Sequence, residues 1–526
     1  MGDNVSTGGD VMGRADEVLS VEHLGVSFVQ YGQGFRRRRV EAIRDLSVRV
    51  MAGELVAVVG ASGSGKSLLA EAILGILPTN ARMSGRIDFL GKELAPAGAS
   101  EARGARIAYI PQSVDCLDPL LRVGSQVPGD TGETALARYG LGPETWRLYP
   151  FQLSGGMARR VLLSTVDLGR ARLVVADEPT PGLTHDLAMQ ALGRLRGFAD
   201  EGRAVLLITH DLDLAYEVAD TVVVLREGRV VERASAEAFR MGPSRLAAPF
   251  SRALWRSLPQ HDFDPGDEWR GVCAGEAAGE GAAGAVAVAS ESGGVPASGA
   301  ARTDGVSSLV SLAPFPREPR ALRAEGVSFS YGRGRNARRV LHDVDFEVCE
   351  GEVVGLVGSS GCGKSTLARV LAGQLEPSAG RVAWDGLPLP SARGTRRGIR
   401  PVQLVYQHPE RAVNPRWRLG RTMREAWEPS VELQREMGID PSWLSRWPNE
   451  LSGGELQRFC IIRALAPETR ILICDEMSTM LDAVTQAQVW RVVLDVARER
   501  GMGVLAITHN DALARRVCDH IVRMGA

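Results

Sequence analysis

The chain has 526 residues, 44% of them hydrophobic, and a formal net charge of −1. This composition is typical of a globular protein, and the small net charge excludes a general electrostatic attraction to nucleic acid or anionic lipid. No apolar run reaches the roughly 18 residues of a membrane span, and the first residues lack the basic and apolar regions of a secretory signal. Seven scattered cysteines without a CxxC pair favour a reducing, cytoplasmic location over a disulfide framework or a zinc site.

The first predicted functional element is the apolar run ELVAVVG, followed by a glycine-rich loop, GASGSGKS, and an apolar helical stretch. Glycines in the pattern G-x-x-x-x-G-K-[ST] let backbone N–H groups turn toward phosphate oxygens, and the helix that follows adds the positive end of its dipole. We predict that Lys66 contacts the β- and γ-phosphates of a nucleotide and that Ser67 ligates Mg²⁺. The residues predicted to bind nucleotide in this loop are Gly60, Ser62, Gly63, Gly65, Lys66 and Ser67.

Two later apolar runs lead directly into polar residues: RLVVADE contains Asp177 and Glu178, and AVLLITH ends at His210. Such runs are typical of strands buried on both faces of a parallel sheet, with functional residues after their carboxyl ends. We expect Asp177 to coordinate Mg²⁺ and Glu178 to orient, or accept a proton from, an attacking water. Acids at strand ends also form plain surface ion pairs, but the preceding phosphate loop favours the catalytic interpretation.

A segment of different composition follows, at residues 264–319. It is rich in Ala, Gly and Ser and has neither a helical nor an alternating period. We predict a flexible linker of about 55 residues with a root-mean-square span of roughly 40 Å. The predicted domains are therefore residues 17–263 and 320–526, joined by this linker.

The second predicted domain repeats the motifs of the first in the same order. Lys66 and Lys364, the two LSGG sequences, and Asp177 and Asp475 are each 298 residues apart. The ITH and glutamine landmarks recur with a slip of only a few residues, which indicates a tandem duplication. The second set of predicted residues is Gly358, Ser360, Gly361, Gly363, Lys364, Ser365, Thr366, Gln407, Asp475, Glu476 and His509.

A phosphate loop, a glutamine, LSGG, Asp-Glu and a histidine, in this order and twice, resemble the nucleotide-binding domain of ABC-family ATPases. The resemblance implies an α/β fold with two tandem P-loop NTPase domains. Each would have a mostly parallel sheet, an antiparallel β subdomain and a helical subdomain. By the same resemblance Gln112 and Gln407 contact Mg²⁺ or water and sense a membrane partner, and His210 and His509 contact the γ-phosphate. Tyr31 and Tyr331 are candidates for stacking on adenine, although aromatic residues near strand ends are often simply core.

The resemblance also implies why two copies are needed, because LSGG in this family binds the γ-phosphate of the nucleotide held by the opposite domain. The predicted contacts are made by Ser154, Gly155, Gly156, Ser452, Gly453 and Gly454. One ATP site would combine Lys66, Asp177, Glu178 and His210 with residues 452–454. The other would combine Lys364, Asp475, Glu476 and His509 with residues 154–156. The serines are suited to cap helices and the glycines allow a close approach to phosphate.

The two copies differ after the Asp-Glu pair. The family resemblance implies a loop that ends in Leu-Asp, and the second copy has Asp482 there, whereas the first has Thr184. Met477 also stands where the family commonly has Pro or Ala. Neutral drift is the simpler explanation of these differences, and our hypothesis is that the two sites hydrolyse ATP at unequal rates.

Three stretches carry a narrower resemblance. SVDCLDPLLRVGSQV follows Gln112, HPERAVNPRWRLGRTM follows Gln407, and APFSRALWRSLP ends the first copy. They resemble stretches of dipeptide, oligopeptide and nickel importers, which implies a cytoplasmic ATPase, peripheral to the inner face of the cell membrane. Its partners would be two transmembrane permease subunits and an extracytoplasmic substrate-binding protein. The cargo stays open among peptides, nickel and metal chelates.

Two other classes of function are alternatives to the importer. A soluble twin-ABC ATPase acting on ribosomes or nucleic acid gains slight support from arginine-rich stretches at residues 36–39 and near Arg333, which are more simply solvated hairpin loops. A nucleotide-binding regulator without hydrolysis is disfavoured by Glu178 and Glu476. No nucleic-acid partner is expected.

Overall fold

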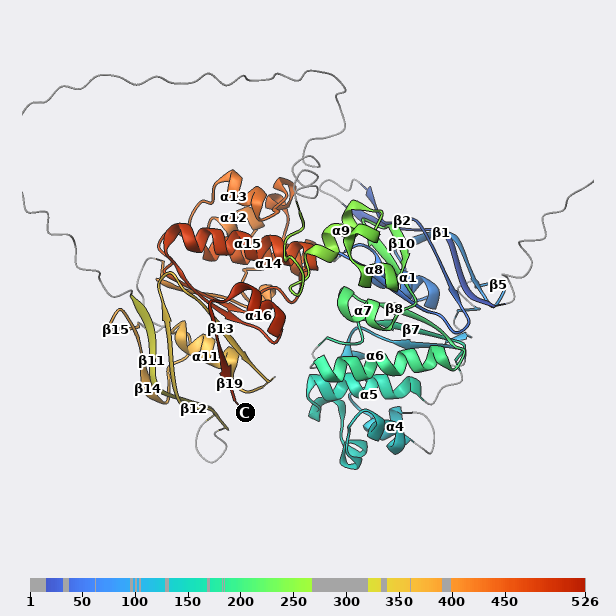
Figure 1. The fold of residues 1–526 in the computed structure, drawn as a ribbon, viewed down its shortest axis with the longest axis horizontal. Helices are drawn as coiled ribbons and strands as arrows, with labels where there is room; N and C mark the ends of the chain where they lie inside the picture. Colours follow the sequence, from blue (N-terminus) through green and yellow to red (C-terminus); the bar gives the residue numbers. More distant parts are fainter. Residues whose placement is uncertain are drawn as a thin grey trace, which may run out of the picture.

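The computed structural model describes most of both predicted domains. The described residues are 16–31, 37–61, 63–94, 98–99, 102–103, 106–127, 132–167, 171–181, 183, 185–266, 320–332, 338–359, 361–389 and 399–525. Most of the predicted linker lies outside them, as do Ser62, Thr184 and Ser360 and the side chain of Tyr31. Figure 1 shows the first half of the chain, in blue to green, beside the second half, in yellow to red.

The first half contains a sheet in the order β10-β9-β3-β8-β7-β6. Its neighbouring strands are parallel except for the antiparallel pair β9 and β10. The strands are β3 (Leu55–Gly60), β6 (Ile107–Ile110), β7 (Leu173–Asp177), β8 (Ala204–Ile208), β9 (Thr221–Arg226) and β10 (Arg229–Ser235). The apolar runs predicted as strands thus form β3, β7 and β8, and every residue of these three strands is buried.

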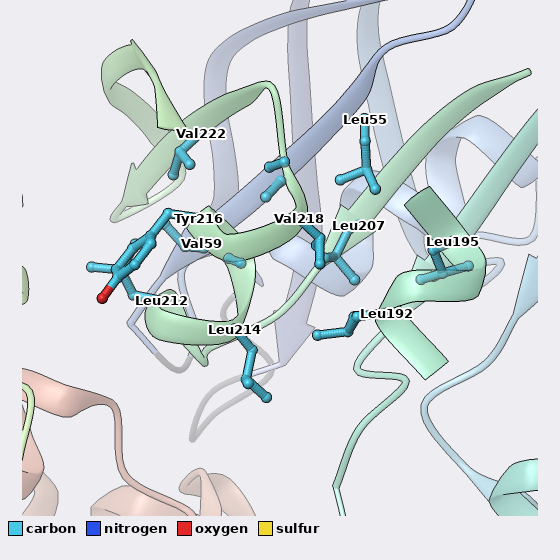
Figure 2. Close-up of a cluster of buried hydrophobic side chains, with 14 of the residues drawn as sticks. Leu55, Val59, Leu192, Leu195, Leu207, Leu212, Leu214, Tyr216, Val218 and Val222 are labelled. Carbon is cyan, nitrogen blue, oxygen red and sulfur yellow. The ribbon is translucent and has the colours of Figure 1, made fainter. Parts of the chain in front are cut away.

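Helices pack against this sheet, and the close-up in Figure 2 shows one of the resulting cores. Leucines of α6 and α7 meet side chains of β3 and β8 in a cluster of buried apolar residues. The helices of this part are α1 (Lys66–Leu74), α6 (His185–Asp200), α7 (Leu212–Val218), α8 (Ala236–Met241) and α9 (Pro249–Arg256), with the 3₁₀ turn η5 (Pro243–Arg245).

Two smaller units complete the first half. One is an antiparallel sheet in the order β2-β1-β4-β5, formed by β1 (Glu17–Tyr31), β2 (Arg37–Met51), β4 (Ala81–Phe89) and β5 (Lys92–Glu93). The other is a helical unit with its own apolar cluster between β6 and β7. It contains η2 (Val114–Cys116), α3 (Val123–Gln126), α4 (Gly132–Arg138), η3 (Pro143–Arg147), η4 (Pro150–Gln152) and α5 (Gly155–Asp167).

The second half repeats this architecture. Its parallel sheet has the order β16-β17-β18-β13-β19 and its antiparallel sheet the order β12-β11-β14-β15. The strands are β11 (Ala321–Tyr331), β12 (Arg338–Cys349), β13 (Val353–Gly358), β14 (Ala379–Trp384), β15 (Leu387–Pro388), β16 (Val402–Val405), β17 (Ile471–Asp475), β18 (Gly503–Ile507) and β19 (His520–Met524). The helices and turns are α11 (Lys364–Leu371), η7 (Pro409–Arg411), α12 (Leu419–Met423), α13 (Val431–Glu436), η8 (Pro441–Ser445), η9 (Pro448–Glu450), α14 (Gly453–Ala464), α15 (Ala483–Arg500) and α16 (Asp511–Val517).

The fold class predicted from the sequence is confirmed, with local differences. The helix after the first phosphate loop ends at Leu74, because Gly75 takes a left-handed conformation (φ 64°) that caps it. Arg39 lies within strand β2, where it donates to Ser27 Oγ at 2.9 Å, so the arginine-rich stretch extends into the sheet. Within the described residues, no helix combines the length and apolar character that a membrane span requires.

The two halves contact each other at several points. Helix α9 of the first half lies against α15 of the second, as Figure 1 shows. Ala483 and Val484, at the start of α15, belong to the same buried cluster as the core of the first half. Phe263 packs against the core of the second half, and Arg516 donates to the backbone carbonyl of Asp262.

Candidate active sites

Both phosphate loops connect a buried strand to a helix that begins at the loop lysine. The residue before each lysine is a glycine in the left-handed region, Gly65 with φ 95° and Gly363 with φ 108°. A Cβ on Gly65 would lie 2.9 Å from Ile43 Cγ1, and one on Gly363 would lie 3.0 Å from Leu341 Cδ2. Only glycine fits both the backbone angle and the space, so these turns keep the backbone free to approach a ligand.

The loop lysines have the same geometry in both halves. Lys66 Nζ donates to the carbonyls of Gly60 at 2.8 Å and Ala61 at 2.9 Å. Lys364 Nζ donates to the carbonyls of Gly358 at 2.8 Å and Ser359 at 2.9 Å. Both ammonium groups are therefore held across a loop whose amides and helix N-terminus suit an anion.

A hydroxyl and a carboxylate meet beside each lysine. Ser67 Oγ donates to Asp177 Oδ1 at 3.3 Å, and Ser365 Oγ donates to Asp475 Oδ1 at 3.0 Å. Burial raises the pKa of Asp177 to about 6 and also raises the pKa of Asp475. A buried carboxylate beside a hydroxyl oxygen fits Mg²⁺, which prefers oxygen ligands and commonly shares them with substrate phosphates.

The glutamates that follow these aspartates have an unusual backbone. Glu178 and Glu476 both have φ 48°, in the left-handed region that side chains rarely adopt. The N–H of Glu178 donates to the carbonyl of Ile208 at 2.8 Å, and that of Glu476 to Ile507 at 3.0 Å. The end of the neighbouring strand thus fixes the direction of each glutamate.

The predicted histidines contact these glutamates. His210 Nδ1 lies 2.8 Å from Glu178 Oε2, and His509 Nδ1 lies 3.3 Å from Glu476 Oε1. Burial lowers the pKa of His210, but the hydrogen bond and charge of Glu178 outweigh it, so its pKa is raised overall. The pKa of His509 is raised chiefly by the hydrogen bond with Glu476. Each carboxylate is therefore oriented by an imidazole.

The two predicted glutamines differ in position. Gln407 Nε2 donates to Glu476 Oε2 at 2.8 Å. Gln112 is exposed, and its side chain makes no hydrogen bond among the described residues. The second site also opens into a cavity of about 180 Å³, lined by Ser365, Arg369, Tyr406, Gln407, His408, Arg411 and Asp475.

The two LSGG segments lie at the start of α5 and α14. Ser154 Oγ accepts from the N–H of Met157 at 3.3 Å, and Ser452 Oγ accepts from the N–H of Glu455 at 3.3 Å. Both serines are exposed. Each serine therefore has the predicted capping role at its helix.

The second LSGG segment packs near Asp482, whose negative charge acts on Lys66 of the first phosphate loop. A Cβ on Gly453 would lie 2.8 Å from Met480 Sδ, so the segment packs closely on the residues before Asp482. Asp482 accepts from the N–H of Thr485 at 3.1 Å and caps α15. Burial lowers the pKa of Lys66, and the negative charge of Asp482 is among the charges that act in the opposite direction. Asp482 of the second half is therefore within electrostatic reach of Lys66 in the first.

Tyr331 is the one predicted adenine-stacking residue whose side chain is described. The residue is 42% exposed, and its ring packs edge-on against Phe329, with 4.9 Å between ring centroids. Its hydroxyl lies 3.3 Å from Thr366 Oγ1, which connects it to the helix after the second phosphate loop. The exposed tyrosine therefore lies next to the helix that follows the second phosphate loop.

A pair of residues at matched positions on the two LSGG helices contacts the glutamine segments and was not predicted from the sequence. Arg159 donates to the carbonyls of Pro111 and Gln112, and Gln457 donates to the carbonyl of Tyr406. These two residues are 298 positions apart, the same spacing as the motifs. Comparing the two copies position by position would have identified them.

The fold and these sites define a P-loop ATPase class, present twice in one chain. The family profile described as ABC transporter matches residues 43–181 and 341–479. The chain belongs to the ABC transporter family and carries two of its ATPase domains.

Similar proteins extend over nearly the whole chain. The glutathione import ATP-binding protein GsiA of Pectobacterium atrosepticum is 30% identical over 96% of this chain and 84% of its own length. The uncharacterized ABC transporter ATP-binding protein YejF of Escherichia coli is 31% identical over 96% of this chain and 93% of its own. A solved structure of RNase-L Inhibitor has a TM-score of 0.56 at 20% identity, covering 94% of this chain and 87% of that one, and shows likeness of fold.

Proposed function

We propose that this chain is the ATP-hydrolysing subunit of an ABC importer for peptides, nickel or metal chelates. ATP-driven closure of its two domains, residues 17–263 and 320–526, would power transport. The relatives named as glutathione import ATP-binding proteins favour a peptide-type cargo among these. Two transmembrane permeases and an extracytoplasmic binding protein would be its partners, and the chain would lie at the inner face of the membrane.

The observation that supports this proposal most directly is that the start of α15, just after Asp482 in the second half, packs in the core of the first half. Gly453 packs on Met480, two residues before Asp482, and the charge of Asp482 reaches Lys66. A nucleotide on the first phosphate loop would thus have residues of the second half close by. Sites shared between domains explain why ATP binding would close the two halves and hydrolysis would release them.

Each reaction centre would divide its work among the described groups. Lys66 and Lys364 would bind the β- and γ-phosphates, and Glu178 and Glu476 would orient, or accept a proton from, the attacking water. The histidines would hold these carboxylates and contact the γ-phosphate. Mg²⁺, held by Ser67, Asp177 and Gln112, or by Ser365, Asp475 and Gln407, would neutralise charge on the phosphates.

Single-site variants test the ATPase part of the proposal. E178Q and E476Q each remove one carboxylate while they keep its size, so each should lower the ATPase rate and leave turnover at the other site. If Thr184 and Asp482 make the sites unequal, the two residual rates will differ. Equal residual rates would remove the asymmetry hypothesis, and two unchanged rates would contradict the catalytic assignment.

Membrane association tests the importer part. The chain should bind washed membranes only when its permeases are co-expressed, and the purified complex should contain a binding protein whose ligand identifies the cargo. Co-sedimentation with ribosomes, without association with permeases, would contradict the importer and support a soluble twin-ABC ATPase.

A further inference from the structure

At one matched position on the helices behind the two LSGG segments, a side chain bonds to the glutamine segment of its own half, and this side chain differs between the copies. Arg159 on α5 donates from Nη1 to the carbonyl of Pro111 at 2.9 Å and from Nη2 to that of Gln112 at 2.5 Å. Gln457 on α14 donates to the carbonyl of Tyr406 at 2.9 Å. The first copy therefore has a forked cationic clamp where the second has a single neutral bond.

The position of Arg159 makes this clamp more than a surface contact. Its side chain is 6% exposed, and its Nε is buried without a partner among the described residues. Burial lowers the pKa of Arg159, and the charges of Glu178 and Asp177 act in the opposite direction. A guanidinium keeps its charge in proteins, so a permanent cation lies near the acidic pair of the first site.

The second copy has two further side-chain bonds from its helix to the segment after β16, whereas the first copy lacks them at the matching positions. In the second copy Cys460 Sγ donates to the carbonyl of Pro409 at 3.8 Å, and Arg463 donates to that of Ala412 at 2.9 Å. The corresponding residues of the first copy are Leu162 and Thr165, and Thr165 donates within its own helix. In the described part of α5, Arg159 thus carries the side-chain bonds to the segment after β6.

We propose that Arg159 is a positioning residue that couples the two ATP sites. It ties Gln112, in the first site, to the helix whose first residues complete the second site. This inference rests on the proposed function, because it requires LSGG to act across the two halves. Coupling between binding sites is reciprocal, so loss of the clamp should weaken the response of each site to the other.

The test compares R159Q with T165V in the full chain. R159Q gives the first copy the residue found at position 457, whereas Thr165 is a control on the same helix whose hydroxyl donates to the carbonyl of Leu162 within α5. We expect R159Q to lower kcat about three- to tenfold and to move the Hill coefficient for ATP toward 1, with KM changed less than about twofold. T165V should keep the wild-type kcat and Hill coefficient.

Hydrogen exchange supplies a second readout, because loss of the clamp should increase exchange at residues 111–116 in R159Q, whereas exchange there should be unchanged in T165V. R159K keeps the charge and loses the fork, and it tests the same expectation if R159Q does not fold. If E178Q and E476Q lower the rate but R159Q and R159K behave as wild type, the coupling role is wrong. Unchanged rates in E178Q and E476Q would instead contradict the proposed function.

Discussion

At the scale of single residues, the two catalytic glutamates predicted here, Glu178 and Glu476, share a strained backbone conformation. Both have φ 48°, a conformation that costs about 1–3 kcal/mol for a residue other than glycine. The same strained angle occurs in both copies, and in both a backbone hydrogen bond to the next strand holds it. Strain of this kind at matching positions points to a requirement on the direction of the carboxylate.

A half-buried carboxyl outside the sites makes stability depend on pH. Burial raises the pKa of Asp213 to about 7 from an ordinary 3.8. Between these two pH values the folded protein keeps a proton that the unfolded chain has lost, so the free energy of unfolding falls as pH rises from about 4 to about 7. D213N removes this loss, and its gain in Tm over wild type should be larger at pH 8 than at pH 5.

The control for D213N is E499Q, an exposed position on helix α15 whose charge is not among those that act on Asp213. Its effect on Tm should be small and similar at both pH values. Thermal unfolding of the three proteins checks the expectation, and an equal gain for D213N at pH 5 and pH 8 would contradict it.

At the scale of elements, the packing of α6 on the central sheet positions the first site. Leu195 is 1% exposed and belongs to the cluster in Figure 2 that includes Leu55 of β3, the strand leading into the first phosphate loop. L195A should lower the free energy of unfolding of the first half by about 2–5 kcal/mol, because it leaves a cavity in this core. Urea titration followed by circular dichroism measures the change.

Leu120 provides the control, since it is 84% exposed. L120A should change stability by less than about 0.5 kcal/mol. Equal effects of L195A and L120A would show that α6 does not pack as the structure has it.

The sequence predicted these elements well where one pattern decided the outcome. Continuous apolar runs became β3, β7 and β8 because strands of a parallel sheet are buried on both faces. The position of Gly65 followed from the loop pattern. The partners of Arg159 could not be predicted, because its contacts depend on how α5 packs beside the segment after β6 and on no local pattern.

At the scale of the whole molecule, contacts between the two duplicated halves bring residues of the second half near the first phosphate loop. The start of α15 packs into the core of the first half. Asp482, which directly precedes α15, acts on Lys66 through its negative charge. Sequence could suggest shared sites only by resemblance, since no spacing indicates which surface of one copy meets the other. The proposed mechanism therefore requires that each LSGG segment serve the opposite phosphate loop.

Pairs of substitutions test this requirement most directly. Ser154 and Ser452 are both exposed, so S154R and S452R place a bulky cation at matched positions. If the sites are shared, E178Q and S452R damage the same site, and the double variant E178Q/S452R should retain the ATPase rate of E178Q. E178Q/S154R damages both sites and should fall to background. The reverse pattern, with activity kept in E178Q/S154R and lost in E178Q/S452R, would show that each half works alone and would contradict the shared sites.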